Sequence, residues 1–219
     1  MPSLPSSLDA PLHLDGLTIP NRLGLTAATP SGAAAAALDS PGLIVVRPFA
    51  GPLGPWLNDE PPREWEESVA GIHATSNALV MAQLVVEGGA GPDPLIFAAQ
   101  RMAAAGFDLL ELVPSPHMMA AAPGMVAALR SSWKNPLVCR FPRGAFEAGY
   151  ARDAVARGLA MISVDAADAD GPAGNGAMIR LRYGISLLAY HRPAPYETLA
   201  LEITEGYADL AVILVEEAY

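Results

Sequence analysis

Short runs of apolar residues recur along the chain, and most are followed by a longer, alanine-rich stretch in which apolar residues keep helical spacing. The runs are largely apolar and do not alternate with polar residues, as is typical of parallel strands buried on both faces. They predict strands at Leu23–Ala28, Leu43–Pro48, Leu79–Val86, Leu109–Val113, Leu137–Phe141, Met161–Asp165, Ile185–Tyr190 and Leu210–Val215. Eight such strands that alternate with helices predict an α/β protein with a (β/α)8 TIM-type barrel.

Helices are expected between these strands. The clearest are at Asp93–Ala105, Pro123–Trp133, Ala145–Arg157 and Tyr196–Glu205, with a short one at Ala33–Ala37. Gly106, Gly158 and Gly206 each follow the end of a predicted helix. A glycine there can adopt the left-handed conformation that ends a helix at little steric cost.

The length of the chain bounds its organisation. With 219 residues it can form one well-buried core, so we expect a single barrel domain over residues 1–219. A barrel of this type usually needs about 250 residues, so this one is truncated, with short loops and no helix after Leu210–Val215. We expect the bare flank to be covered by the N-terminal segment, by a homo-oligomer or partner subunit, or by side chains that tolerate solvent.

Charge and apolar content exclude several classes of partner. The net charge of −10 argues against nucleic acid and against anionic membrane surfaces. No apolar run is long enough to cross a bilayer, and residues 1–10 contain no basic residue that would mark a secretory signal. We therefore expect a soluble cytoplasmic protein.

Cysteine and histidine usage predicts no metal site. The single Cys139 excludes an internal disulfide and lies in an apolar strand, which favours a buried small side chain over a reactive thiol. The four histidines are too scattered for the usual ligand spacing. Asp165, Asp168 and Asp170 form an acidic loop that is either solvated or able to hold a hard cation.

One segment at the start of the chain is highly distinctive. Residues Pro11–Leu23 combine an apolar-polar hairpin with the turn Leu-Thr-Ile-Pro-Asn-Arg, which resembles the opening of the old yellow enzyme family of NADH:flavin oxidoreductases. The resemblance recurs in Gly71–Ala74, Met81–Leu84, Phe97–Leu112 and Pro136–Arg140, and it thins out after about Arg143.

This resemblance implies a cofactor and a reaction. Members of the family bind FMN at the barrel mouth, accept hydride from NAD(P)H and pass it to a small-molecule substrate, often an activated alkene. By position, Thr29, Gln83 and Arg140 are the residues that would contact the flavin ring. The flavin supplies the redox chemistry and the protein orients it.

The sequence departs from the family where the substrate binds. The family places a pair of hydrogen-bond donors after its fourth strand to hold the substrate's carbonyl oxygen, but Val113 and Pro116 stand there. Without donors the charge that develops on that oxygen loses its stabilisation. His117 lies one residue out of register and either takes over as the catalytic donor or is a plain loop histidine.

The residues expected to bind the FMN phosphate differ from the family pattern as well. Relatives place glycines after the seventh strand and Gly-Arg after the eighth, whereas this chain has His191-Arg192-Pro193 and Glu216-Glu217. Two carboxylates oppose a bound phosphate unless a cation intervenes. His191 and Arg192, with Arg140 and Arg143, either supply that cation or are solvated loop charges.

Two tryptophans lie in or beside a loop rich in proline and glycine. Trp56 falls within this loop, after the second predicted strand, and Trp65 follows shortly after it. Loops at that end carry function in such barrels. The two side chains either line a pocket or anchor the loop onto its own scaffold.

Three functions follow from these patterns. The first is an FMN-dependent NAD(P)H oxidoreductase scaffold whose substrate and phosphate sites are degraded. The second is a non-catalytic barrel, a pseudoenzyme, that acts as a binding or assembly subunit. The third is a barrel without flavin that binds a small anion through Arg140, Arg143, His191 and Arg192.

Overall fold

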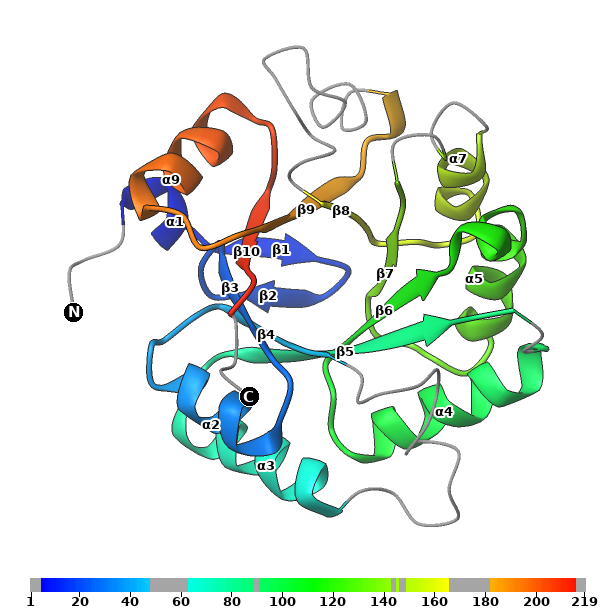
Figure 1. The fold of residues 1–219 in the computed structure, drawn as a ribbon, viewed down its shortest axis with the longest axis horizontal. Helices are drawn as coiled ribbons and strands as arrows, with labels where there is room; N and C mark the ends of the chain where they lie inside the picture. The colour runs from blue at the N-terminus through cyan, green and yellow to red at the C-terminus, as the bar shows by residue number, and fades with distance from the viewer. Residues whose placement is uncertain are drawn as a thin grey trace.

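Eight parallel strands close into a barrel in the order β10-β3-β4-β5-β6-β7-β8-β9 (Figure 1). The computed structural model describes residues 5–47, 63–88, 91–142, 145, 149–165 and 182–215. The strands are β3 (Leu23–Ala27), β4 (Leu43–Val46), β5 (Leu79–Val86), β6 (Leu109–Pro114), β7 (Leu137–Arg140), β8 (Met161–Asp165), β9 (Ser186–His191) and β10 (Leu210–Ile213). Every strand predicted from the apolar runs is present, which confirms the α/β TIM-type barrel.

Helices surround the ring of strands (Figure 1). They are α1 (Ser6–Asp9), α2 (Pro30–Ala37), α3 (Arg63–Thr75), α4 (Pro92–Ala104), the 3-10 helix η2 (Pro116–Ala121), α5 (Ala122–Arg130), α7 (Tyr150–Val155) and α9 (Tyr196–Glu205). Gly106, Gly158 and Gly206 have φ angles of 89°, 95° and 79°, so the predicted left-handed ends are confirmed. None of the helices in the described ranges is long and apolar enough to span a bilayer.

A hairpin fills the N-terminal end of the barrel. Strands β1 (Leu12–Leu14) and β2 (Leu17–Ile19) pair antiparallel around Asp15 and Gly16, whose positive φ angles of 37° and 88° suit a tight two-residue turn. Three hairpin side chains are buried with the first residues of several barrel strands: Leu12, Leu14 and Ile19 pack in one cluster with Leu43, Met81, Leu109 and Val138. In Figure 1 the hairpin lies inside the ring of strands.

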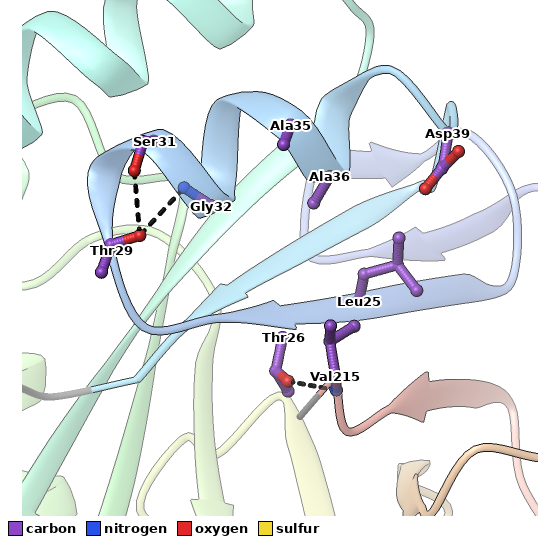
Figure 2. A pocket seen from close by; sticks show the side chains of 9 residues that line it. All are labelled: Leu25, Thr26, Thr29, Ser31, Gly32, Ala35, Ala36, Asp39 and Val215. Carbon is purple, nitrogen blue, oxygen red and sulfur yellow. Dashed lines mark hydrogen bonds between the residues drawn. The ribbon is translucent and has the colours of Figure 1, made fainter. Parts of the chain in front are cut away.

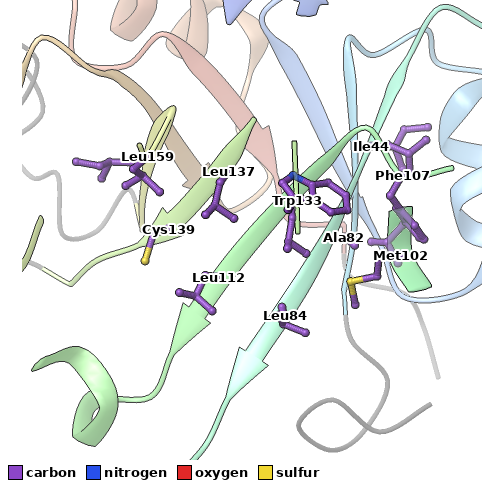
Figure 3. Packing of buried hydrophobic residues seen from close by; sticks show 14 of the residues in the cluster. Ile44, Ala82, Leu84, Met102, Phe107, Leu112, Trp133, Leu137, Cys139 and Leu159 are labelled. Atoms are coloured by element: carbon purple, nitrogen blue, oxygen red, sulfur yellow. The ribbon is translucent and has the colours of Figure 1, made fainter. Parts of the chain in front are cut away.

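A second apolar layer separates the strands from the helices, and Figure 3 shows part of it. Cys139 belongs to this layer and is fully buried, as the sequence predicts. Trp65 lies in α3 rather than in a loop, is 2% exposed, and its ring lies 6.4 Å from that of Phe107. It therefore packs the barrel, while Trp56 falls outside the described residues.

Asn21 ties the starts of β3 and β4 together. Its Oδ1 accepts hydrogen bonds from the backbone N–H groups of Leu23 and Gly42, at 3.1 and 2.7 Å, and its Nδ2 donates to the Ser40 carbonyl at 2.9 Å. A Cβ on Gly42 would lie 2.2 Å from the Asn21 carbonyl oxygen. The backbone at position 42 therefore passes so close to Asn21 that only a residue without a side chain fits there.

The N-terminal segment lies at the flank between β10 and β3. Helix α1 packs beside α9, where Ser7 Oγ donates to the Ala200 carbonyl at 3.1 Å, and the buried Leu8 accepts from the N–H of Arg22 at 2.6 Å. On the same flank, between β3, α2 and the residues after β10, lies an open groove of about 540 Å³ (Figure 2). It is lined by Leu25, Thr26, Thr29, Ser31, Gly32, Ala35, Ala36, Asp39 and Val215.

Candidate functional site

Glu111 is a carboxylate buried inside the barrel. It lies on β6 two residues after Leu109, a member of the interior cluster, and side chains two apart on a strand share a face. The residue is 0% exposed. An ionised group in such a place is costly unless it is paired and hydrogen-bonded, so its partners define the site.

Four neighbouring strands supply those partners. Oε1 accepts from Ser163 Oγ at 2.5 Å and from Arg140 Nε at 3.2 Å. Oε2 accepts from Tyr190 OH at 2.5 Å, from Gln83 Nε2 at 2.6 Å and from an Arg140 terminal nitrogen at 3.5 Å. Strands β5, β7, β8 and β9 thus converge on one carboxylate. We call Gln83, Glu111, Arg140, Ser163 and Tyr190 the mouth cluster.

Arg140 remains charged in this cluster, and Tyr190 remains neutral. Burial, the largest single influence, lowers the pKa of Arg140, but the charges of Glu111 and Asp165 and the contact with Tyr190 together raise it more, so the pKa is above its ordinary value. Burial raises the pKa of the Tyr190 phenol, and the charge of Glu111 raises it further. The cluster therefore pairs the Arg140 cation with the Glu111 carboxylate, to which the hydroxyls of Tyr190 and Ser163 both donate.

On its outer side the cluster meets Asp165. The Asp165 carboxylate lies 3.9 Å from Arg140 Nη1 and its side chain is 55% exposed, against 23% for that of Arg140. Asp168 and Asp170, the other members of the predicted acidic loop, fall outside the described residues. Within the described ranges there is no group of three His, Cys, Asp or Glu that could hold a metal ion.

Two residues that the family resemblance assigns to the flavin ring meet in the mouth cluster. Gln83 and Arg140 both contact Glu111, although they are far apart in the sequence. The third, Thr29, caps α2: its Oγ1 accepts from the Gly32 N–H at 3.0 Å and lies 3.2 Å from Ser31 Oγ. Figure 2 shows Thr29 at the edge of the flank groove.

His191 points toward the helix layer. It follows the interior residue Tyr190 on β9, so its side chain lies on the other face of the strand, with Nε2 3.2 Å from Glu202 Oε2 of α9. Burial lowers the pKa of His191 to about 4, so it is neutral at pH 7. Its contact with α9 places it apart from the mouth cluster.

Two further predicted residues, Arg192 and His117, are exposed. Arg192 follows β9, and His117 lies on η2 just beyond β6. Among the described residues, no hydrogen bond or ion pair joins either of them to the mouth cluster, and Arg143, Glu216 and Glu217 fall outside those residues. Val113 is half-buried at the end of β6, and its side chain has no hydrogen-bond donor.

The structure adds residues that the sequence patterns did not single out. Glu111, Ser163 and Tyr190 complete the cluster, and a lone charge within the apolar run Leu109–Leu112 is a signal that could have identified the first. Ser115 follows β6, and its buried hydroxyl has no hydrogen-bond partner among the described residues. A hydroxyl donor is thus present close to the place where the family's donor pair is missing.

Comparison with known proteins adds evidence on the fold. No protein-family model matches the sequence, and no curated protein has significant sequence similarity to it. Among solved structures, morphinone reductase in complex with tetrahydroNAD aligns with a TM-score of 0.68 and 17% identity over 94% of this chain and 86% of that one. The old yellow enzyme from Trypanosoma cruzi aligns with a TM-score of 0.67 and 14% identity over 95% and 88%.

The chain has the fold of the old yellow enzymes. The 6-hydroxypseudooxynicotine amine oxidase from Pseudomonas geniculata N1 shares this fold, with a TM-score of 0.68 and 12% identity over 94% of this chain and 46% of that one. Because one barrel serves several chemistries, an old-yellow-enzyme fold leaves the reaction to be argued from the site.

Proposed function

We propose that the protein is an FMN-dependent NAD(P)H oxidoreductase of the old yellow enzyme type with reduced substrate and phosphate sites. One observation carries the proposal. Gln83 and Arg140, which the family resemblance assigns to the flavin ring, are held side by side on Glu111 in the barrel interior.

The polar groups left over in the cluster suit a flavin ring. Gln83 uses its amide nitrogen for Glu111 and Tyr190, which leaves its amide oxygen as an acceptor that no other described residue uses. Arg140 Nη1 lies 3.9 Å from an oxygen of Asp165. The pyrimidine part of a flavin carries an imide N–H and carbonyl oxygens, so an acceptor beside a charged donor matches it. When bound, the flavin supplies hydride transfer.

The substrate site supports only weak activation of a carbonyl. Val113 donates no hydrogen bond, Pro116 is exposed and donates none, and His117 is exposed on η2. We therefore expect reduction of carbonyl-activated alkenes to be slow, since one missing donor of this kind costs about 100-fold to 1000-fold in kcat. His117 and the unpartnered Ser115 are the candidate replacements.

Phosphate binding is expected to be weak as well. His191 is neutral and lies against α9, so it contributes no positive charge. Arg192 is then the candidate cation after β9. If the phosphate contributes little, riboflavin and FMN will bind with similar affinity.

The test is the visible absorption spectrum of the protein before and after FMN is added and the mixture is desalted. A retained flavin band in the wild type, and its loss in Arg140→Gln, is the expected result. Arg152→Gln is the matched control, because Arg152 is an exposed arginine on α7 whose ion-pair partner among the described residues is Asp153. No retained band, or equal retention in both variants, contradicts the proposal.

A second candidate function is a non-catalytic barrel that binds a partner subunit or a second copy. The groove on the β10–β3 flank favours it, because the apolar side chains Leu25, Ala35, Ala36 and Val215 line it, and Val215 is 41% exposed. Light scattering during size-exclusion chromatography would then show an oligomer, and Ala36→Arg would return it to a monomer. A monomer that retains FMN would exclude this alternative.

A further inference from the structure

We propose that Glu111 is the positioning residue of the barrel mouth: it fixes the amide of Gln83 and the guanidinium of Arg140, and it offsets the charge of Arg140. The identity of the ligand rests on the proposed function. The role of Glu111 within the mouth cluster rests on its own contacts, so the two can fail separately.

Glu111 determines which way the Gln83 amide faces. An ionised carboxylate only accepts hydrogen bonds, so the group that Gln83 presents to it must be the NH2. Tyr190 donates its proton to Glu111, so the phenol oxygen also accepts from Gln83 Nε2, at 3.1 Å. The amide oxygen of Gln83 must then face away from Glu111. Replacing the carboxylate removes the reason for this orientation.

Glu111 also holds the guanidinium of Arg140. Nε and a terminal nitrogen lie 3.2 and 3.5 Å from its two oxygens, and the group stacks on the Tyr190 ring with 4.0 Å between the guanidinium carbon and the ring centre. Without Glu111 the remaining carboxylate near Arg140 in the described ranges is the more exposed Asp165. We expect Arg140 to turn toward it.

Within the mouth cluster, the charge of Glu111 offsets that of Arg140. A ligand that gains negative charge, as a flavin ring does on reduction, is stabilised less by an Arg140 whose charge Glu111 cancels than by a free one. Glu111→Gln keeps the size and removes the charge. We expect it to favour the reduced flavin about tenfold over the oxidised form, which corresponds to about 30 mV for a two-electron couple.

The experiment compares Glu111→Gln with Glu67→Gln, the same exchange on the exposed face of α3. Two quantities are measured: the midpoint potential of bound FMN, and the ionisation of Tyr190 in the flavin-free protein, taken as the tyrosinate absorbance lost in Tyr190→Phe. In Glu111→Gln the potential should rise and Tyr190 should ionise at lower pH. In Glu67→Gln neither should move.

The outcomes separate the two proposals. If the wild type retains no FMN, the proposed function fails and the Tyr190 ionisation alone decides the role of Glu111. A folded Glu111→Gln protein with unchanged Tyr190 ionisation overturns that role, and so does a potential that stays constant or falls.

Glu111→Gln can also fail to fold, because it leaves the half-buried Arg140 without its nearer counter-ion. The double variant Glu111→Gln/Arg140→Gln then serves as the second test. If the double variant folds and the single variant does not, the result supports the offset of the Arg140 charge by Glu111. A double variant that is no more stable than the single one overturns it.

Discussion

The guanidinium of Arg140 stacks on the ring of Tyr190, with 4.0 Å between the guanidinium carbon and the ring centre. Both side chains also bond to Glu111, so the ring and the carboxylate fix the cation from two directions. The contact joins β7 to β9, which are not neighbours in the sheet because β8 lies between them. Both the folding stability of the protein and the position of the Arg140 guanidinium should therefore depend on Tyr190.

Tyr190→Phe separates the two contacts of this residue. The ring remains below Arg140, but the hydroxyl that donates to Glu111 at 2.5 Å is lost. A buried acceptor that loses a donor costs about 1–3 kcal/mol of unfolding free energy. Tyr190→Leu should cost about 1 kcal/mol more, because the cation–π contact is lost as well. Urea denaturation of the variants checks both values, and a Tyr190→Phe protein as stable as the wild type would contradict the first.

His191 should make the protein less stable in mild acid. Its pKa is about 4 in the folded state, because of burial, against 6.5 for the free side chain. A lowered pKa gives stability that is present above pH 6.5 and is lost as the pH falls toward 4. The loss is roughly 3 kcal/mol between pH 7 and pH 4.

This loss should disappear in His191→Leu, measured by urea denaturation across that pH range. Burial raises the pKa of Glu202, which faces His191 and works in the opposite sense, so both proteins should also carry Glu202→Gln. His117→Gln is the control, because His117 is exposed and its removal should leave the pH dependence unchanged. An equal pH dependence with and without His191 would refute this prediction.

Two glycines should respond to alanine in opposite directions. In Gly42→Ala the new Cβ would lie 2.2 Å from a backbone oxygen of Asn21, so we expect a loss of at least about 2 kcal/mol or no folded protein. Gly124 lies within α5 and has open space around it. Alanine there should add about 0.5–1 kcal/mol through helix propensity. Thermal unfolding of both variants tests the pair, and a loss of stability in Gly124→Ala would show that the helix argument fails.

Substitutions of Thr29 test whether this residue only caps α2 or also contacts the flavin. Its Oγ1 caps α2 by accepting from the Gly32 N–H, and Thr29→Ala should cost about 1 kcal/mol of stability. Thr29→Ser keeps the cap and should be close to the wild type. If Thr29 only caps the helix, FMN retention will be equal in the alanine and serine variants. Weaker retention confined to alanine, at a temperature where both are folded, would assign it a contact with the flavin.

The barrel itself could be predicted because its strands are short apolar runs with a clear rhythm. Their ends differ from the prediction by two residues at most, as with β10, which ends at Ile213 rather than Val215. Helix α3 is harder to predict, since it carries charged residues in its first turn and follows a sequence rich in proline. For that reason Trp65 could not be assigned to the core from the sequence alone.

The site could be predicted only in part. Gln83 and Arg140 were identified through the family resemblance, but no local pattern indicates that strands β5, β6, β7, β8 and β9 converge on Glu111. Such contacts depend on the register of the closed sheet. His191 was expected at the phosphate site, because the sequence alone does not show that Tyr190 faces the interior; with Tyr190 inside, the period of two along β9 puts His191 on the outer face.

The hairpin of β1 and β2 determines from which end a molecule can reach the barrel interior. Its side chains Leu12, Leu14 and Ile19 close the N-terminal end, so no molecule can approach Glu111 from that end of the barrel. Any molecule that enters must leave by the way it came. Two reactants that use the same space would have to take turns, and a compound lodged at the entrance would block both of them.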